Sequence, residues 1–361
     1  MIIYAGFIFR NAWFFSRIQV ESPLFMKETP MVSVIIPARN EASSLQACLN
    51  SAAQQIYPKD RYEVIVVDDH STDATFGIAA ILGTKYPNIR IVSSRGEGKK
   101  AALNSGISVA RGEIILQTDA DCDLPPTWIP HMVAQFNQNT ALVSGPVELQ
   151  WGDKWLEKFQ AMESMGLVTI GGGSMAARKP NMCNGANLAF RKAVFQEVNG
   201  YEGIDAVASG DDELLLQKIH RLGKYELKFA RCKEAIVRTI PQPNWQMLKS
   251  QRLRWVSKAR VYPDRRVNLI QSVSYLAFLS IPLLTVFACW NWQFAVLAGE
   301  LLILKILTDY LLMYQAAKFF HNLRMLRYVL PLQLVYIPYV LWVGLAGNLV
   351  KTYSWKGRTV R

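Results

Sequence analysis

The sequence predicts an α/β domain with a mostly parallel sheet flanked by helices, followed by transmembrane α-helices at the C-terminal end. Two observations lead to this fold class. Short β-branched runs alternate with a helical segment between residues 31 and 121, an order that gives parallel strands joined by right-handed crossovers. Residues 267–299 contain no charged side chain, and residues 269–290 suffice to cross a hydrocarbon core of about 30 Å.

The first strands place carboxylates at their ends. Residues 32–37 and 63–69 are β-branched runs closed by turn formers, with a helix expected over 41–49 between them. Residues 89–92 form a third strand, and a fourth begins at residue 114. In such a sheet, ligands bind beyond the carboxyl ends of the strands, where Asp68, Asp69, Asp119 and Asp121 all fall.

Two of these carboxylates favour a metal site. Asp119 and Asp121 follow the fourth strand one residue apart, and both can converge on one side once the strand becomes a turn. They would present hard oxygen ligands to one divalent cation that bridges a diphosphate. Taken alone, the pair is also compatible with a solvated turn.

Several motifs in order resemble those of a known family. Residues 32–41, 67–73, 98–104 and 118–121 are similar to the nucleotide-binding motifs of the family 2 glycosyltransferases, which have the GT-A fold and invert the anomeric centre. Residues 209–213 resemble their acid-pair motif, and residues 251–255 fit the Gln-x-x-Arg-Trp motif of the membrane-embedded branch. The resemblance covers roughly residues 31–258 and implies a glycosyltransferase that uses a nucleotide-sugar donor.

The resemblance also implies which residues bind the donor. The carboxylate after the second strand holds the base or ribose in the family, a role that falls to Asp69 with Asp68 beside it. A helix cap is the alternative for this stretch, and a solvated turn is the alternative for Lys99. UDP is the preferred nucleotide, and Mg²⁺ or Mn²⁺ at Asp119 and Asp121 is the expected cofactor. The residues expected at the nucleotide are Pro37, Arg39, Glu41, Asp68, Asp69, Lys99 and Asp119.

An acceptor hydroxyl must lose a proton during transfer, which requires a carboxylate base within hydrogen-bond reach. The register of the following helix, residues 213–223, matches the family with Asp212 in the position of the base and Asp211 in the acidic position before it. The alternative for either carboxylate is an N-cap of that helix.

The acceptor side is assigned to a helix near residue 251. Gln251, Arg254 and Trp255 are spaced i, i+3 and i+4 and therefore share one helix face. The resemblance places Trp255 near the acceptor and Arg254 near the diphosphate, while Asn184 and Gly185 resemble the sugar-binding loop. The alternative is a basic interfacial helix, given the cluster Lys249, Arg252, Arg254, Lys258, Arg260, Arg265 and Arg266.

These features divide the chain into an N-terminal interfacial or truncated anchor segment (1–30), a GT-A catalytic domain (31–240), amphipathic interfacial helices with the Gln-Arg-Leu-Arg-Trp sequence (241–266) and a transmembrane region of about three helices (267–361). Residues 2–15 are apolar but too short to span and are interrupted by Arg10. Residues 171–175, Gly-Gly-Gly-Ser-Met, predict a mobile loop. The five cysteines show no paired spacing, which fits a reducing compartment.

The membrane region leaves two questions open. The second apolar segment, residues 294–317, contains Glu300, Lys305 and Asp309, which either neutralise one another inside the bundle or line the entry for an amphiphilic acceptor. The positive-inside rule places the catalytic domain and the loop around Arg324 in the cytoplasm. A third full crossing would then put Lys351, Lys356, Arg358 and Arg361 outside, against the same rule.

The predicted function is therefore transfer of a sugar from a nucleotide-diphosphate donor to a lipid acceptor at the cytoplasmic leaflet of the cell (inner) membrane. A processive polysaccharide synthase with a glycan acceptor is the alternative, although such enzymes generally use more membrane helices. A non-catalytic basic module is a remote alternative suggested by the net charge of +12. It leaves the ordered carboxylates unexplained, and no nucleic-acid partner is expected.

Overall fold

The computed structural model describes residues 1–25, 29–205, 209–257, 264–349, 353–355 and 358–360. Its catalytic half contains β1 (Val32–Ala38), α2 (Leu45–Ala53), β2 (Tyr62–Asp68), α3 (Thr75–Lys85), β3 (Ile89–Ser93), α4 (Lys99–Val109), β4 (Ile114–Gln117), α5 (Trp128–Val133), β5 (Thr140–Ser144), β6 (Val147–Leu149), α6 (Trp155–Ala176), η2 (Gly185–Asn187), β7 (Leu188–Arg191), α7 (Lys192–Glu197), α8 (Glu213–Arg221), β8 (Glu226–Phe229), η3 (Lys233–Ala235) and β9 (Val237–Thr239). The remaining elements are α1 (Ile2–Ser16), η1 (Pro23–Phe25), α9 (Trp245–Ser257), α10 (Arg265–Phe287), α11 (Gln293–Phe319), η5 (Leu323–Tyr328), α12 (Val329–Leu349), β10 (Tyr353–Trp355) and β11 (Arg358–Val360).

The main sheet has seven strands in the order β3-β2-β1-β4-β7-β5-β8. Its neighbouring strands are parallel except where β7 pairs with β4 and with β5. Strand β1 is buried on both faces, which explains why every position except Ser33 is apolar. Val34 and Ile36 pack with α2, α3 and α5 on one face, whereas Ile35 packs with α4, α6 and α8 on the other. The expected α/β class and mostly parallel sheet are confirmed.

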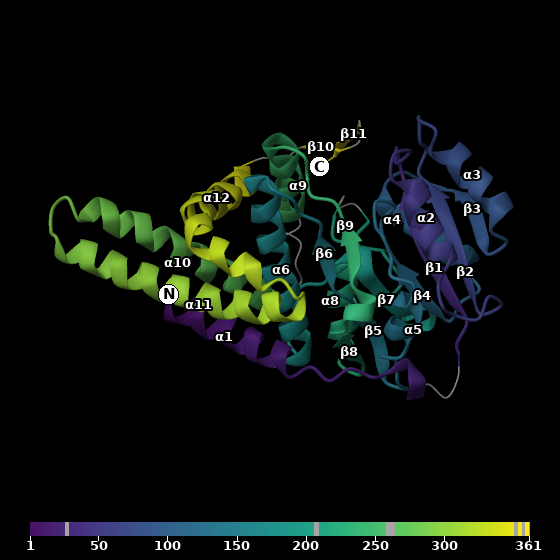
Figure 1. The fold of residues 1–361 in the computed structure, drawn as a ribbon, viewed down its shortest axis with the longest axis horizontal. Coiled ribbons are helices and arrows are strands. Elements are labelled where there is room, and N and C mark those ends of the chain that lie inside the picture. The colour runs from purple at the N-terminus through teal and green to yellow at the C-terminus, as the bar shows by residue number, and fades with distance from the viewer. Residues whose placement is uncertain (26–28, 206–208, 258–263, 350–352, 356–357, 361) are drawn as a thin grey trace.

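The predicted loop at residues 171–175 is wrong. Gly171, Gly172 and Gly173 lie inside α6, the long helix that contacts β6 and β8 as well as α1 and α11 (Figure 1). A Cβ atom on Gly173 would lie 2.0 Å from the backbone oxygen of Asn11 in α1. The glycines therefore allow α1 to approach the backbone of α6 closely, and the tertiary contact outweighs their low helix propensity.

We expect Gly173→Ala to destabilise the protein by about 1–3 kcal/mol, because the new methyl group cannot be accommodated without moving α1. The measurement is denaturant unfolding of the detergent-solubilised protein. Gly77→Ala is the matched control: it also places a methyl group on a helical glycine, and there the added Cβ would meet nothing within 4 Å. Equal stability of the two variants would contradict the close contact between α1 and α6.

Helix α1 has two different faces. Tyr4, Ile8 and Phe15 are buried against α6, α10 and α11, whereas Ile2 and Phe9 are exposed. One face therefore docks on the helices, and the other presents apolar side chains outward. This arrangement is compatible with the interfacial helix expected for residues 1–30.

Helices α10 and α11 form a hairpin that projects away from the catalytic half (Figure 1). By length and composition, Arg265–Phe287 and Leu323–Gly347 could cross a membrane, and 17% of each apolar window is buried. Helix α11, expected as the middle span, is 27 residues long but carries four charged side chains, those of Glu300, Lys305, Asp309 and Lys318. In the described part of the chain, two of the three expected spans are therefore long and apolar enough to cross a membrane.

The charges of α11 are mostly neutralised inside the helix bundle. Lys305 Nζ donates to Asp309 Oδ2 at 2.6 Å, and Tyr4 Oη donates to Asp309 Oδ1 at 2.6 Å. Gln333 of α12 donates to the same carboxylate at 2.8 Å. The structural interpretation of Lys305 and Asp309 is confirmed, and neither lines the cavity described below, whereas Glu300 is exposed.

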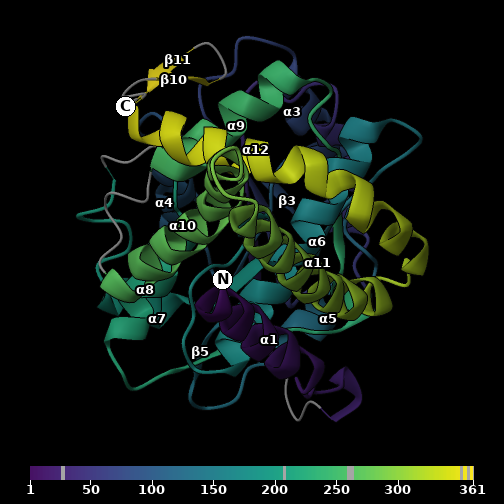
Figure 2. The same ribbon diagram turned by 90° about the vertical axis from the view of Figure 1, so that its left-hand side faces the viewer.

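Helix α12 stays close to the catalytic half at both of its ends (Figures 1 and 2). The preceding η5 contacts α6, and Trp155 of α6 packs edge-on against Tyr328. After α12, strand β10 contacts α9. Of the basic residues that created the topological conflict, Lys351, Lys356 and Arg361 lie outside the described residues.

Candidate functional site

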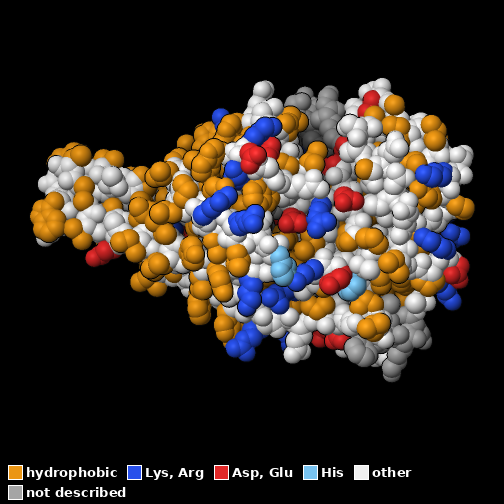
Figure 3. Space-filling view, in the orientation of Figure 1, with side chains coloured by type: hydrophobic (Ala, Val, Ile, Leu, Met, Phe, Trp, Pro, Cys, Tyr) orange, Lys and Arg blue, Asp and Glu red, His pale blue; other side chains and the backbone are white. Residues whose placement is uncertain are grey.

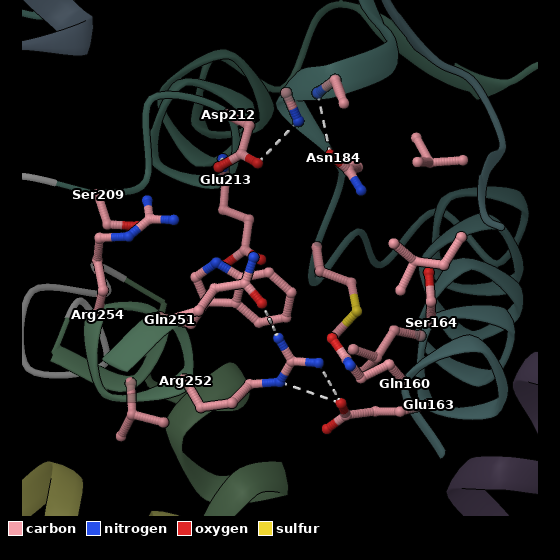
Figure 4. Close-up of a pocket in the computed structure, with 18 of the residues that line it drawn as sticks. Gln160, Glu163, Ser164, Asn184, Ser209, Asp212, Glu213, Gln251, Arg252 and Arg254 are labelled. Atoms are coloured by element: carbon pink, nitrogen blue, oxygen red, sulfur yellow. Dashed lines mark hydrogen bonds and ion pairs between the residues drawn. The ribbon is translucent and has the colours of Figure 1, made fainter. Parts of the chain in front are cut away.

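One cavity of about 1620 Å³ extends from the carboxyl ends of β1 and β4 to the helices α9, α10 and α12. Figure 4 shows the part of the cavity where Asp212 and Glu213 lie opposite residues of α6 and α9. Asp68 is the one predicted site residue that does not line it. Those that do are Pro37, Arg39, Glu41, Asp69, Lys99, Asp119, Asp121, Asn184, Gly185, Asp211, Asp212, Gln251, Arg254 and Trp255.

Arg39 joins the loops that follow β1 and β2. Its Nη1 atom donates to the carbonyl oxygens of Asp69 at 2.7 Å and His70 at 2.9 Å. Asn40 and His70 have positive φ angles of 51° and 55°, so each chain turns sharply after its strand. The two loops therefore form one rigid wall of the cavity.

Asp68 and Asp69 occupy different environments. Asp69 lines the cavity, and its Oδ2 accepts a hydrogen bond from the backbone N–H of Gly98 at 3.1 Å. Asp68 is buried behind it, and its Oδ1 has no hydrogen-bond partner among the described residues. Before α3, Asp73 accepts from the N–H of Thr75 at 3.0 Å, and Asp68 Oδ2 accepts from the N–H of Ser71 at 3.3 Å.

Lys99 connects the Asp-x-Asp strand end to the acid pair. Its Nζ lies 2.7 Å from Asp119 Oδ1 and 3.3 Å from Asp211 Oδ2. Burial alone would lower the pKa of Lys99, but the charges of Asp119 and Asp211 outweigh burial and raise that pKa. Burial likewise opposes ionisation of Asp211, yet Lys99 and a hydrogen bond from Gln117 lower its pKa.

Gln117 was not identified from the sequence. This fully buried amide ends β4 and donates from Nε2 to Asp211 Oδ2 at 2.7 Å. The available signal was a polar residue at the end of an otherwise apolar strand, directly before the Asp-x-Asp turn. Gly185 lies against this contact, because a Cβ atom there would be 2.9 Å from Gln117 Nε2 and 3.0 Å from Asp211 Oδ2.

The two acidic residues are not equivalent. Asp211 is buried and held by Lys99 and Gln117, whereas Asp212 is half-buried at the start of α8. Asp212 Oδ1 accepts from the N–H of Glu213 at 2.7 Å, and Oδ2 accepts from the N–H of Gly185 at 2.9 Å (Figure 4). Asp212 is therefore an N-cap, as the alternative expected. Each carboxylate oxygen has a second lone pair, so this geometry is compatible with a role as base.

The residues at the end of β4 fit a divalent cation that takes some ligands from the protein and others from a bound substrate. Asp119 and Asp121 both line the cavity, and the side chain of Asp119 is 37% exposed. Within the described residues, no group of three or more His, Cys, Asp or Glu side chains could hold a metal ion. Two carboxylates suit Mg²⁺ or Mn²⁺, which take further oxygens from phosphates and water.

Helix α9 brings Gln251, Arg254 and Trp255 to the same cavity, as predicted. The intervening Arg252 is only 4% exposed and contacts Glu163 of α6 (Figure 4). From the sequence, Arg252 was assigned to a basic membrane-surface cluster. Its pairing with Glu163 could not be recognised there, because Glu163 lies 89 residues earlier in the chain. Lys258 and Arg260 of that cluster lie outside the described residues.

Comparisons with known proteins identify the family. Residues 33–198 match the model of glycosyl transferase family 2. Over 226 residues the chain is 33% identical to glycosyltransferase AglE of Haloferax volcanii, an alignment that covers 62% of this chain and 71% of that protein. The chain belongs to glycosyltransferase family 2. The expected enzyme class is thereby confirmed, whereas the comparisons do not test the Gln-x-x-Arg-Trp branch.

A second relative and a solved structure are also similar to this chain. Over 135 residues, this chain is 34% identical to the undecaprenyl-phosphate 4-deoxy-4-formamido-L-arabinose transferase of Aeromonas hydrophila, an alignment that covers 36% of this chain and 40% of that protein. A mannosyltransferase from Pyrobaculum calidifontis, solved with GDP-Man and Mn²⁺, superposes with a TM-score of 0.62 at 21% identity. That match covers 89% of this chain and 96% of the mannosyltransferase, and it supports the GT-A fold.

Proposed function

We propose that this glycosyltransferase is a membrane-bound, inverting enzyme that adds one sugar from a nucleotide-diphosphate donor to a lipid acceptor at the cytoplasmic leaflet. The observation that carries the proposal is the continuity of the cavity. Its walls include the strand-end carboxylates and also Ile270 of α10 and Val343 of α12, two helices with membrane-like surfaces. Its volume of about 1620 Å³ exceeds the roughly 300–1,000 Å³ of a typical small-molecule site, so donor and acceptor can bind together.

The α10–α11 hairpin is the proposed membrane anchor. At about 1.5 Å per residue, its 23-residue and 27-residue helices are about 35 and 40 Å long, enough for a hydrocarbon core of about 30 Å. Trp290 and Trp292 are 77% and 71% exposed at the tip, where aromatic side chains suit a membrane interface. Apolar side chains cover the hairpin, and Lys and Arg gather at its base (Figure 3).

We place α12 along the membrane surface instead of across it. Its neighbours η5 and β10 contact α6 and α9, so both ends of α12 stay on the side of the catalytic domain. Two crossings by the hairpin would return the chain to the cytoplasm. The basic residues after α12 would then obey the positive-inside rule, which removes the conflict raised by three full crossings.

The residues of the cavity divide the reaction between them. Asp69, with Asp68 behind it, would accept hydrogen bonds from the base or ribose, and Asp119 and Asp121 would hold Mg²⁺ or Mn²⁺. The cation, when bound, stabilises the negative charge that develops on the leaving diphosphate. Asp212 would take the proton of the acceptor hydroxyl, while Arg254 faces the diphosphate and Trp255 packs against the acceptor.

The relatives support the class of substrate. The Aeromonas relative is named for an undecaprenyl-phosphate substrate, which is a lipid. The mannosyltransferase with the similar fold was solved with GDP-Man, whereas the motifs of this chain favour UDP. Both nucleotides therefore belong in the test.

We expect the purified enzyme, incubated with radiolabelled UDP- and GDP-sugars, to attach one sugar per lipid however long the donor is supplied. Parallel reactions contain a polyprenyl phosphate, a diacylglycerol or an oligosaccharide, and mass spectrometry reads the products. A ladder of growing oligosaccharides would instead establish a processive synthase. Release of free nucleotide without acceptor measures donor use independently of the acceptor chosen.

A further inference from the structure

A buried polar cluster joins three helices at the acceptor end of the cavity. Its members are Glu163 of α6, Arg252 of α9 and Tyr339 of α12, and all three line the cavity. The helices belong respectively to the catalytic domain, the Gln251–Trp255 segment and a candidate membrane helix. We call these three residues the α9 anchor.

Each of the three side chains of the α9 anchor contacts the other two. Arg252 Nε donates to Glu163 Oε2 at 3.0 Å and to Tyr339 Oη at 2.9 Å, and Nη2 makes a second close contact with Glu163 Oε2. Tyr339 Oη donates to Glu163 Oε1 at 2.9 Å. Glu163 and Tyr339 together therefore hold the guanidinium group of Arg252 in one position.

Arg252 also touches two of the predicted acceptor-side residues. Its Nη1 donates to the side-chain oxygen of Gln251 (Figure 4). Its guanidinium carbon lies 4.1 Å from the centre of the Trp255 ring. One side chain therefore orients an amide on one side and an aromatic ring on the other. A planar guanidinium stacks on the ring while its N–H groups point at fixed angles to the amide, a geometry that the compact ammonium group of Lys does not reproduce.

Helix α6 holds the entry to α9 as well. Gln160, one turn before Glu163, donates to the backbone oxygen of Gln242 at 2.9 Å and accepts from its N–H at 2.8 Å. The chain is thus gripped just before α9 begins and again in its third turn. Gln160 and Glu163 therefore connect the start and the middle of α9 directly to α6.

The burial of the ion pair makes a purely stabilising role a poor explanation. The side chains of Arg252 and Glu163 are 5% and 9% exposed. Desolvation of two charges commonly offsets most of their attraction, so a buried pair is weak evidence for added stability. Its geometry, by contrast, specifies where Gln251 and Trp255 lie.

We infer that Arg252 is a positioning residue for the acceptor: anchored by Glu163 and Tyr339, it holds Gln251 and Trp255 against the acceptor end of the cavity. The inference rests on the proposed function, in which this end receives the lipid acceptor. Arg252 does not itself meet the reacting atoms. The donor nucleotide, bound at the strand ends, should be insensitive to it.

The test compares Arg252→Lys with wild-type enzyme in acceptor kinetics and in donor binding. We expect kcat/KM for the acceptor to fall about 100-fold, because small displacements of positioning groups have effects of that size. Calorimetric donor affinity should change less than about threefold, and nucleotide release to water should persist. Arg238→Lys is the control, since Arg238 forms another Arg–Glu pair, with Glu148 at 3.2 Å, that does not line the cavity.

A second pair of variants separates positioning from folding. Glu163→Gln alone leaves the buried Arg252 charge unpaired and should lower the melting temperature, whereas Glu163→Gln with Arg252→Gln removes both charges and should restore it. We expect acceptor kcat/KM to stay low in the restored double variant. Recovery of acceptor use together with stability, or wild-type kinetics in Arg252→Lys, would overturn the inference. Absence of any lipid product from wild-type enzyme would instead refute the proposed function.

Discussion

Replacing Asp212 with Asn is expected to lower turnover by about 10²–10⁴-fold while donor affinity remains nearly unchanged. The loss follows because Asn cannot take the proton of the acceptor hydroxyl. The fold should be retained, since Asn is as good an N-cap as Asp and its amide oxygen can still accept from the backbone N–H of Glu213. The amide nitrogen of Asn cannot replace the oxygen that accepts from the N–H of Gly185. Steady-state kinetics with both substrates and calorimetric nucleotide binding provide the two measurements.

Asp211→Asn is the informative comparison. Asp211 pairs with Lys99 at 3.3 Å and accepts from Gln117 at 2.7 Å, so its loss should disturb the Lys99–Asp119 contact and weaken donor binding. The two variants should therefore differ in which parameter changes. A loss confined to donor affinity in Asp212→Asn would assign Asp212 to binding and remove it as the base.

Asp121→Asn is expected to abolish the dependence of donor binding on Mg²⁺ or Mn²⁺ and to reduce turnover severely. A neutral amide oxygen is a weaker ligand for a hard cation than a carboxylate, and the diphosphate would lose the ion that neutralises it. Nucleotide affinity is measured by calorimetry with the metal and with EDTA. The wild-type enzyme should show a large difference between the two conditions, and the variant should show none.

The control for this experiment is Asp60→Asn. The side chain of Asp60 is 82% exposed, pairs with Arg61 and does not line the cavity. It should leave the metal dependence unchanged. Full wild-type turnover in excess EDTA, or undiminished turnover in Asp121→Asn, would remove the metal from the proposed chemistry.

Local sequence patterns were sufficient to predict the first strands of the main sheet. Strands β1, β2 and β4 lie where the β-branched runs predicted them, and their ends bring Asp69, Asp119 and Asp121 to one cavity. Parallel strands that end at one sheet edge must bring their following residues together, so the pattern alone was informative. The spacing of Gln251, Arg254 and Trp255 succeeded for the same kind of reason, because a helix repeats every 3.6 residues.

The glycine run shows where a local pattern fails, and α12 shows what a local pattern leaves open. Three successive glycines usually mark a loop, but Gly173 is held in α6 by the close approach of Asn11, 162 positions away in the chain. The apolar composition of α12 indicates a possible crossing, and only the contacts of η5 with α6 and of β10 with α9 led us to propose a position along the membrane surface. Composition records what a segment can bury and leaves open which neighbour buries it.

The sequence by itself determined the fold class, the strand-end carboxylates and the motif helix, because these depend on short spacings and on periodicity. The resemblance of its ordered motifs to a known family indicated the family. Only the tertiary structure decided that Gln117 orders Asp211, 94 positions later, and that Glu163 meets Tyr339, 176 positions later. It also decided that Asp211 is sealed by Lys99 while Asp212 caps α8 at the cavity. Hydrogen bonds of this kind depend on how distant elements pack, which no local pattern of residues encodes.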